Sequence, residues 1–239
     1  MSTTETKTRS PRRRLGDLVF SGTSRAAGLV ILLALAGVAV FLTINGIPAL
    51  GAGSADLSGR ANFWAYAGPL VFGTLWAAVI ALLIATPLSI AVALGVSHYA
   101  PRRLATPLGY LVDLLAAVPS VVYGLWGIGF LGPQLIPLYQ WLDKHASWIP
   151  LFAGPASTTG RTILTAGIVL AIMVLPIITA ISREIFAQTP RLNEEAALAL
   201  GATRWEMIRL SVFPYARSGV VSAVMLGLGR AMGETMAVA

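Results

Sequence analysis

The sequence predicts an all-α protein, a polytopic membrane bundle of helices behind a short basic tail. Of its 239 residues, 56% are hydrophobic and only 11% are charged, whereas a soluble domain carries about 25% charged residues. The mean hydropathy is +0.77. Several apolar runs reach the roughly 20 residues that a helix needs to cross a bilayer. We therefore expect a tail over 1–25 and one transmembrane domain over 26–239.

The apolar runs predict membrane-spanning helices at about 26–47, 69–96, 108–131, 163–181 and 215–239. The first run has a basic lead, as a cleaved signal peptide does, but its apolar core exceeds the usual length of about 7–15 residues. We therefore expect an uncleaved first span, with cleavage as the alternative. Because the sequence is still apolar at Ala239, we expect five spans present out of six.

The basic residues predict the orientation of the bundle. With the N-terminus inside, 13 of the 17 Lys and Arg residues fall in inner segments and three in outer segments. Such an excess of positive charge is typical of cytoplasmic loops. The basic tail has no interleaved aromatic residues on which bases could stack, so we do not expect nucleic-acid binding. Without cysteines, disulfides and Cys-ligated metals are excluded.

A polar, helix-prone segment separates the last two apolar runs. Asn193 is a suitable N-cap, and Glu194 and Glu195 place negative charge in the first helical turn. Gly201 suits the left-handed conformation that ends a helix. A second helix is predicted to start at Thr203, which has a Glu three residues later, as in a capping box. The segment is therefore predicted to be a helix, a turn and a second helix.

Two functions fit this helical segment on physical grounds. It is either an amphipathic loop lying on the membrane surface, or a docking site that offers Leu198 and Leu200 to a partner protein. The chain cannot supply an ATPase of its own, because a P-loop requires Gly-Lys-Ser/Thr. Its only lysines, Lys7 and Lys144, do not follow glycine.

A charged pair, Arg230 and Glu234, lies inside the last apolar run. Charges at this depth are costly and usually face the bundle interior or a water-filled path. Residues four apart share one face of a helix, so the two form either an ion pair that merely tolerates burial or an anion-binding step on a path. Arg offers a planar fork of donors that fits a phosphate or carboxylate. Gly229 and Gly233 predict close helix packing, with room for a substrate as the alternative.

The helical segment resembles the EAA loop of ABC importer permeases, which carry Glu-Ala-Ala, three residues, Gly, nine residues and an Ile-x-Leu-Pro-like ending. Glu195-Ala196-Ala197, Gly201 and Pro214 fall in this register, with Ser211 and Phe213 where Ile and Leu are usual. The resemblance implies a cytoplasmic coupling loop at about 183–213. It also implies that Glu195, Ala196, Ala197 and Gly201 contact an ATPase.

Two further stretches indicate a narrower group within the ABC importer permeases. Gly229-Arg230-Ala231-Met232-Gly233-Glu234-Thr235-Met236-Ala237 and Ala117-Val118-Pro119-Ser120-Val121-Val122-Tyr123-Gly124-Leu125-Trp126-Gly127 resemble phosphate ABC importer permeases of the PstC type. This resemblance implies a type I ABC importer permease fold and a role in transport for Arg230 and Glu234. Ser120 and Tyr123 would line the path, or else Pro119 is a plain helix kink.

The same resemblance implies the other parts of a phosphate importer. These are a second, homologous permease subunit, a dimer of ATP-binding subunits on the cytoplasmic face and an extracytoplasmic phosphate-binding protein. The chain itself would bind no cofactor and would not be an enzyme, because ATP and Mg would be held by the partner subunit. The expected location is the bacterial cell membrane. The alternatives are a permease for molybdate or sulfate, a passive anion channel and a membrane scaffold.

Overall fold

The computed structural model describes residues 15–51, 62–149 and 154–234, and every regular element in these ranges is helical. The chain divides into two compact units, Met1–Pro69 and Leu70–Ala239. Within the described ranges, five helical stretches are long and apolar enough to cross a membrane. The predicted all-α polytopic membrane fold is thus confirmed.

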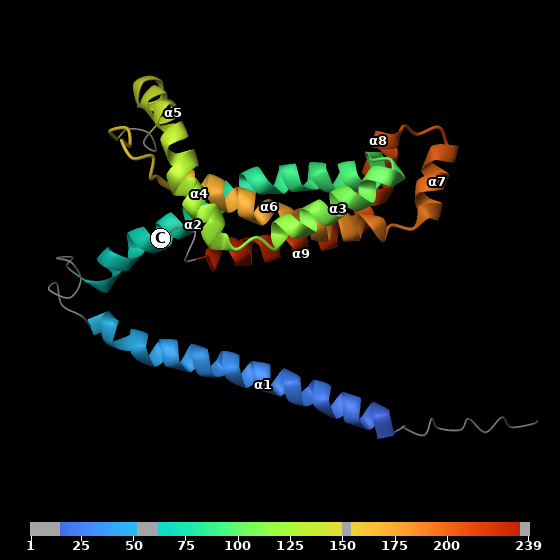
Figure 1. Ribbon diagram of the computed structural model, residues 1–239, viewed down its shortest axis with the longest axis horizontal. Coiled ribbons are helices and arrows are strands. Elements are labelled where there is room, and N and C mark those ends of the chain that lie inside the picture. Colours follow the sequence, from blue (N-terminus) through green and yellow to red (C-terminus); the bar gives the residue numbers. More distant parts are fainter. Residues whose placement is uncertain (1–14, 52–61, 150–153, 235–239) are drawn as a thin grey trace, which may run out of the picture. The chain divides into compact units, whose positions relative to one another are not determined.

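The main element of the first unit is α1 (Leu15–Gly46), which is followed by a 3-10 turn, η1 (Ile47–Gly51) (Figure 1). The helix begins eleven residues before the predicted span, and residues 1–14 of the predicted tail lie outside the described ranges. Its 32 residues extend about 48 Å. Ile31, Leu32 and Leu33 point in three directions and are all exposed. A helix that is apolar all round suits a lipid environment.

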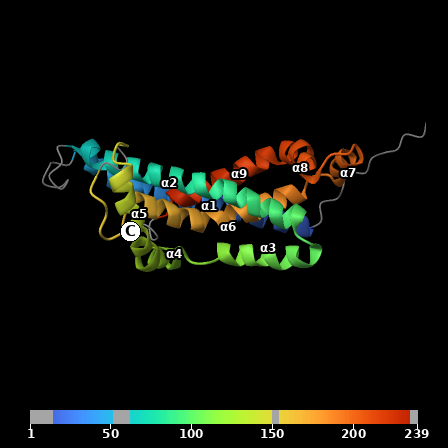
Figure 2. The same cartoon turned by 90° about the horizontal axis from the view of Figure 1, so that it is seen from above.

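The other elements follow in a simple order along the chain. They are α2 (Phe63–Leu94), η2 (Gly95–Tyr99), α3 (Arg102–Ala116), α4 (Ser120–Trp126), η3 (Gly127–Leu131), α5 (Gly132–His145), α6 (Ile163–Ala187), α7 (Arg191–Ala199), α8 (Arg204–Met207), η4 (Ile208–Val212) and α9 (Phe213–Met232). The segments η2, η3 and η4 are short π-helical stretches. In both views of the second unit, α7 and α8 lie at one end and α4 and α5 at the other (Figures 1 and 2).

Helix α6 is the centre of the second unit and packs against α3 and α9. It also meets α2, whose Ala77, Ala81 and Ala85 are buried at a spacing of four residues in the same core cluster as Val174 and Ile178 of α6. Small side chains at this spacing allow two helices in a membrane to approach closely.

Polar side chains support the contact between the C-terminal part of α2 and the middle of α6. The Ser89 hydroxyl donates to the Leu175 carbonyl at 2.9 Å, and the Thr179 hydroxyl donates weakly to the Ser89 carbonyl at 3.5 Å. Ser89 and Thr179 are both fully buried. Such hydrogen bonds between helices hold them together where apolar contacts alone give little specificity.

Close packing between α6 and α9 depends on glycines other than those the sequence indicated. A Cβ on Gly227 would come within 2.8 Å of side-chain atoms of Ile178 and Val174 on α6. By contrast, a Cβ on Gly229 would meet no heavy atom of the described residues within 4 Å, and one on Gly233 would meet only the Gly229 carbonyl, at 3.2 Å. The prediction that Gly229 and Gly233 pack closely is therefore not met within this part of the chain.

The span predicted at 108–131 is wrong. Helix α3 ends at Ala116, Pro119 adopts an extended conformation, and a new helical stretch of membrane-spanning length runs over Ser120–His145. Proline disfavours a helical conformation in the residue before it and lacks an N–H to continue the helix. The effect of Pro119 is thus a complete break between α3 and α4 rather than a kink.

The last predicted span, 215–239, also differs in its bounds. A continuous helical run extends over Arg204–Met232 and ends before Gly233. Residues 235–239 lie outside the described ranges. The second helix of the polar segment therefore continues directly into the last span.

Candidate functional site

The polar segment folds as a helix, a turn and a second helix, as predicted, but its first helix starts earlier. Helix α7 begins at Arg191 with Pro190 as its N-cap, and Asn193 lies within its first turn. The expectation that Asn193 caps the helix is wrong, because the fixed φ of Pro190 near −60° already prepares the chain for a helix.

The turn after α7 is built on Gly201, which has a φ of +87°. The Gly201 N–H donates to the Leu198 carbonyl at 3.0 Å, and the Ala202 N–H donates to the Ala197 carbonyl at 3.2 Å. These two hydrogen bonds form a Schellman motif. The prediction that Gly201 ends the helix in a left-handed conformation is confirmed.

The start of α8 is a capping box. The Thr203 hydroxyl accepts a hydrogen bond from the Glu206 N–H at 3.3 Å, and the Glu206 carboxylate accepts one from the Thr203 N–H at 2.8 Å. This reciprocal pair satisfies two backbone donors that a helix start leaves open. It confirms the predicted start and fixes the direction in which the chain re-enters the bundle.

The helix–turn–helix rests on an apolar cluster formed by the ends of three long helices. This base cluster contains Ala93, Leu94, Phe186, Met207, Ile208, Val212 and Ala216. Ala197 of α7 packs partly buried against it. Because α2, α6 and the α8–α9 run all contribute side chains, the base cluster joins these helices where α7 packs on them.

The opposite side of α7 is open. Glu195 and Ala196 are exposed, as are Leu192 at 75%, Leu198 at 44% and Leu200 at 90%. An open hollow of about 570 Å³ lies beside this surface, between α7, the Gly201 turn and η4. Exposed leucines beside a hollow are typical of a surface that another protein covers.

The charged pair is present at the end of α9. The Arg230 Nη2 and Glu234 Oε2 atoms lie 3.7 Å apart, and the two side chains are 48% and 6% exposed. Helix α9 ends at Met232, so Glu234 follows the helix. The sequence predicted instead that Glu234 and Arg230 share one face of the helix. The separation between the Nη2 and Oε2 atoms is longer than a hydrogen bond, and the half-exposed guanidinium carries five N–H donors.

The weaker candidates Ser120 and Tyr123 lie just after the break at Pro119. The Tyr123 hydroxyl donates to the Leu115 carbonyl at 3.0 Å, which satisfies a carbonyl group at the end of α3. The ring packs against the same core cluster that contains Ala231. Ser120 is half-buried as the first residue of α4. Tyr123 thus has a structural role at the break, and a place on the path stays a prediction for both residues.

Two contacts between ionisable side chains of distant segments were not foreseen. Arg183 on α6 donates to both carboxylate oxygens of Asp113 on α3, at 3.2 and 3.3 Å. His98 in η2 lies 3.6 Å from Glu194 in α7. The contact between Asp113 and Arg183 had a signal in the sequence, because Asp113 lies inside an apolar run and a charge there requires a partner. The position of Asp113 in the sequence does not say which arginine is that partner.

These features define a membrane protein with an exposed, leucine-bearing helix at one end of its second unit and a half-exposed arginine near the end of α9. Residues 85–239 match the family described as "Binding-protein-dependent transport system inner membrane component". Relatives named "Phosphate transport system permease protein PstC 2" from Mycobacterium bovis and Mycobacterium tuberculosis are each 48% identical over 238 residues, covering 95% of this chain and 73% of the relative.

A relative named "Phosphate transport system permease protein PstC" from Mesorhizobium japonicum is 41% identical over 239 residues, which cover 95% of this chain and 72% of the relative. The chain therefore belongs to the family of binding-protein-dependent transport system inner membrane components, among its PstC-type permeases.

Proposed function

We propose that this chain is the transmembrane permease subunit of an ATP-driven importer that moves inorganic phosphate into the cell. The observation that carries the proposal is the similarity over most of the chain to relatives named as phosphate transport permeases. Arg230, half-exposed near the end of α9, supports it chemically, because a guanidinium binds a phosphate oxygen pair through two parallel hydrogen bonds.

The proposed energy source is a dimer of ATP-binding subunits that dock on α7 and hold ATP and Mg. The support is the exposed side of α7, with Glu195, Ala196 and Leu200, ending at the rigid turn of Gly201. This surface would then face the cytoplasm, as would the N-terminus, with the chain in the bacterial cell membrane. The chain would make no covalent bond to its substrate and would act as a transport subunit alone.

The proposed path passes Arg230. With no phosphate present, Glu234 holds the guanidinium and lowers the cost of leaving a charge in the membrane. An arriving phosphate takes over the donors on the exposed side of Arg230. A second, homologous permease subunit would complete the path, and an extracytoplasmic phosphate-binding protein would deliver phosphate to it.

Uptake of radiolabelled phosphate tests this function. Cells that lack the gene are rescued with the full-length gene and assayed at low external phosphate, with sulfate and molybdate as competitors. We expect rescue that only phosphate-like anions inhibit and that ATP depletion abolishes. Inhibition by sulfate or molybdate would indicate a permease for another oxyanion, and uptake that survives ATP depletion would indicate a passive channel.

A further inference from the structure

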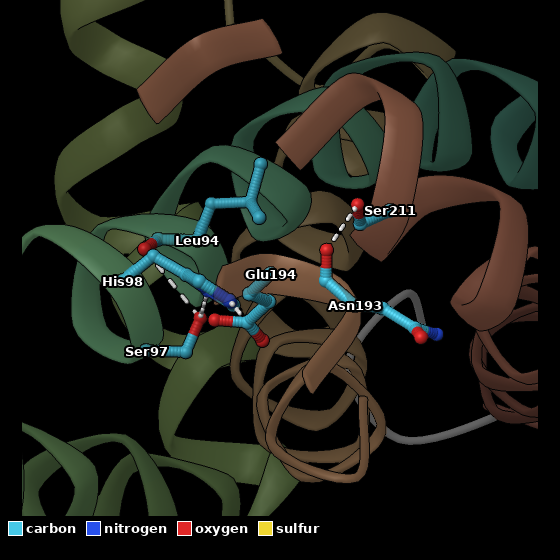
Figure 3. Close-up of polar contacts among 6 residues, drawn as sticks. All are labelled: Leu94, Ser97, His98, Asn193, Glu194 and Ser211. Carbon is cyan, nitrogen blue, oxygen red and sulfur yellow. Dashed lines mark hydrogen bonds and ion pairs between the residues drawn. The ribbon is translucent and has the colours of Figure 1, made fainter. Parts of the chain in front are cut away.

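The position of α7 is fixed by more than its two chain connections. Along the chain, α7 follows α6 after three residues and precedes α8 by a short turn. A third connection crosses space to α2, through His98 in the π-helical segment η2 (Figure 3). The His98 Nε2 and Glu194 Oε1 atoms lie 3.6 Å apart, and the side chains are only 10% and 22% exposed.

The His98 ring is held in the orientation that this contact requires. The Ser97 hydroxyl lies 2.7 Å from the His98 Nδ1, and the ring meets Phe186 edge to face, with 6.5 Å between centroids. When the hydroxyl donates to Nδ1, the ring proton is on Nε2 and points to Glu194; a protonated ring also has a donor there. In both of these states, His98 offers an N–H to the carboxylate. Since an ionised carboxylate only accepts, the contact with Glu194 favours these states over the tautomer with its proton on Nδ1.

The first turn of α7 is held from a second side as well. The Ser211 hydroxyl in η4 donates to the Asn193 carbonyl at 3.2 Å, next to Glu194 (Figure 3). Asn193 and Glu194 are therefore tied to the α8–α9 run and to α2, respectively. The next residues, Glu195 and Ala196, remain exposed. In α7, Asn193 and Glu194 thus contact the bundle, while the next two residues, Glu195 and Ala196, are accessible to a partner.

We propose that His98 is a positioning residue, and that its contact with Glu194 passes the displacement of α7 to α2. This inference rests on the proposed docking of an ATPase at α7. Without the contact, α7 would reach α2 only through the base cluster on which Ala197 packs, and would act mainly on α6 and α9, its neighbours along the chain. With it, α2 moves together with them, and α2 is the helix whose Ala77, Ala81 and Ala85 are packed in the core with α6.

The test measures phosphate transported per ATP hydrolysed by the complete transporter, reconstituted with its binding protein in vesicles. Four proteins form a double-mutant cycle: wild type, His98→Ala, Glu194→Ala and the double variant. We expect each single variant to lower the transport per ATP about two- to fivefold, because a contact of 3.6 Å is longer than a hydrogen bond and contributes no more than a surface ion pair does. The double variant should lose no more than one single variant, because both remove the same contact.

His145→Ala is the matched control, because His145 is the chain's other histidine and lies at the opposite end of the second unit, in α5. Transport per ATP should stay at the wild-type value in this protein. If His98→Ala reaches the membrane poorly, His98→Gln, which retains a donor, should restore most of the coupling. Unchanged transport per ATP in Glu194→Ala, or additive losses in the double variant, would overturn the proposal. A wild-type transporter without ATP-driven phosphate uptake would instead contradict the proposed function.

Discussion

At the scale of single residues, local chemistry decides how the proposed docking surface on α7 is shaped. Gly201 holds a left-handed conformation in which its N–H and that of Ala202 cap the end of α7. Thr203 and Glu206 then start the next helix. Because these hydrogen bonds connect residues close in sequence, the local pattern of residue types is sufficient to predict them.

Replacing Gly201 should damage docking in proportion to how poorly the new residue adopts a positive φ. Gly201→Ala costs about 1–2 kcal/mol in this conformation, whereas Asn tolerates it better. We expect Gly201→Ala to retain less of the ATP-binding subunit than Gly201→Asn, with wild type highest, as measured by co-purification in detergent. Equal retention in all three proteins would show that the turn does not shape the docking surface.

At the scale of helices, contacts between segments far apart in sequence determine how the bundle is held. Arg183 crosses from α6 to Asp113 on α3 with 24% and 48% of the side chains exposed. A Cβ on Gly109 of α3 would lie 2.9 Å from the Arg183 Cζ atom, so the arginine runs directly over this glycine. The absence of a side chain at Gly109 makes room for the ion pair.

Asp113→Asn should loosen the contact between α3 and α6. The neutral amide removes the charge from the pair, and we expect a loss of about 1 kcal/mol of stability, because both groups are partly exposed. The measurement is the thermal unfolding midpoint in detergent. Asp143→Asn in α5 is the matched control and should leave the midpoint unchanged. Equal shifts in the two variants would mean that the Asp113 pair adds no stability.

The packing of α6 on α9 makes a second comparison at this scale. Gly227→Ala places a methyl group within 2.8 Å of Ile178 and Val174, and overpacking of this kind costs about 1–3 kcal/mol. Gly229→Ala, two residues away, meets open space within the described part of the chain. We expect a lower unfolding midpoint for Gly227→Ala alone. A larger effect at Gly229 would show that the close contact lies on the other face of α9.

The sequence predicts features that depend on local patterns, but not contacts that depend on how distant helices pack. Apolar composition predicts that spans exist, and local caps predict the turn at Gly201. Composition does not say where a continuous apolar run breaks, so 108–131 was predicted as one helix despite Pro119. The contacts of His98 with Glu194 and of Arg183 with Asp113 depend on how distant helices pack. No local pattern specifies either partner, which is why these residues were missed.

At the scale of the whole molecule, one helical run connects the end of the second unit that carries α7 to the charged pair. The Arg204–Met232 run of 29 residues extends about 43 Å from the Thr203 cap to the end of α9. It starts beside α7, contributes to the base cluster through Met207, and carries Arg230 in its last turn. If an ATPase docks on α7 as proposed, this run is the direct connection through which a displacement of α7 and α8 would reach the arginine on the proposed path.

The most direct test of the central claim is radiolabelled phosphate uptake by cells that carry wild type, Arg230→Ala or Arg217→Ala in place of the native gene. Arg217 is the matched control, because it is an exposed arginine on the same helix. Amounts of each protein in the membrane are compared by immunoblotting. The account predicts that Arg230→Ala reaches the membrane but fails to import phosphate, while Arg217→Ala imports it normally. Normal uptake by Arg230→Ala would contradict the claim that phosphate passes this residue.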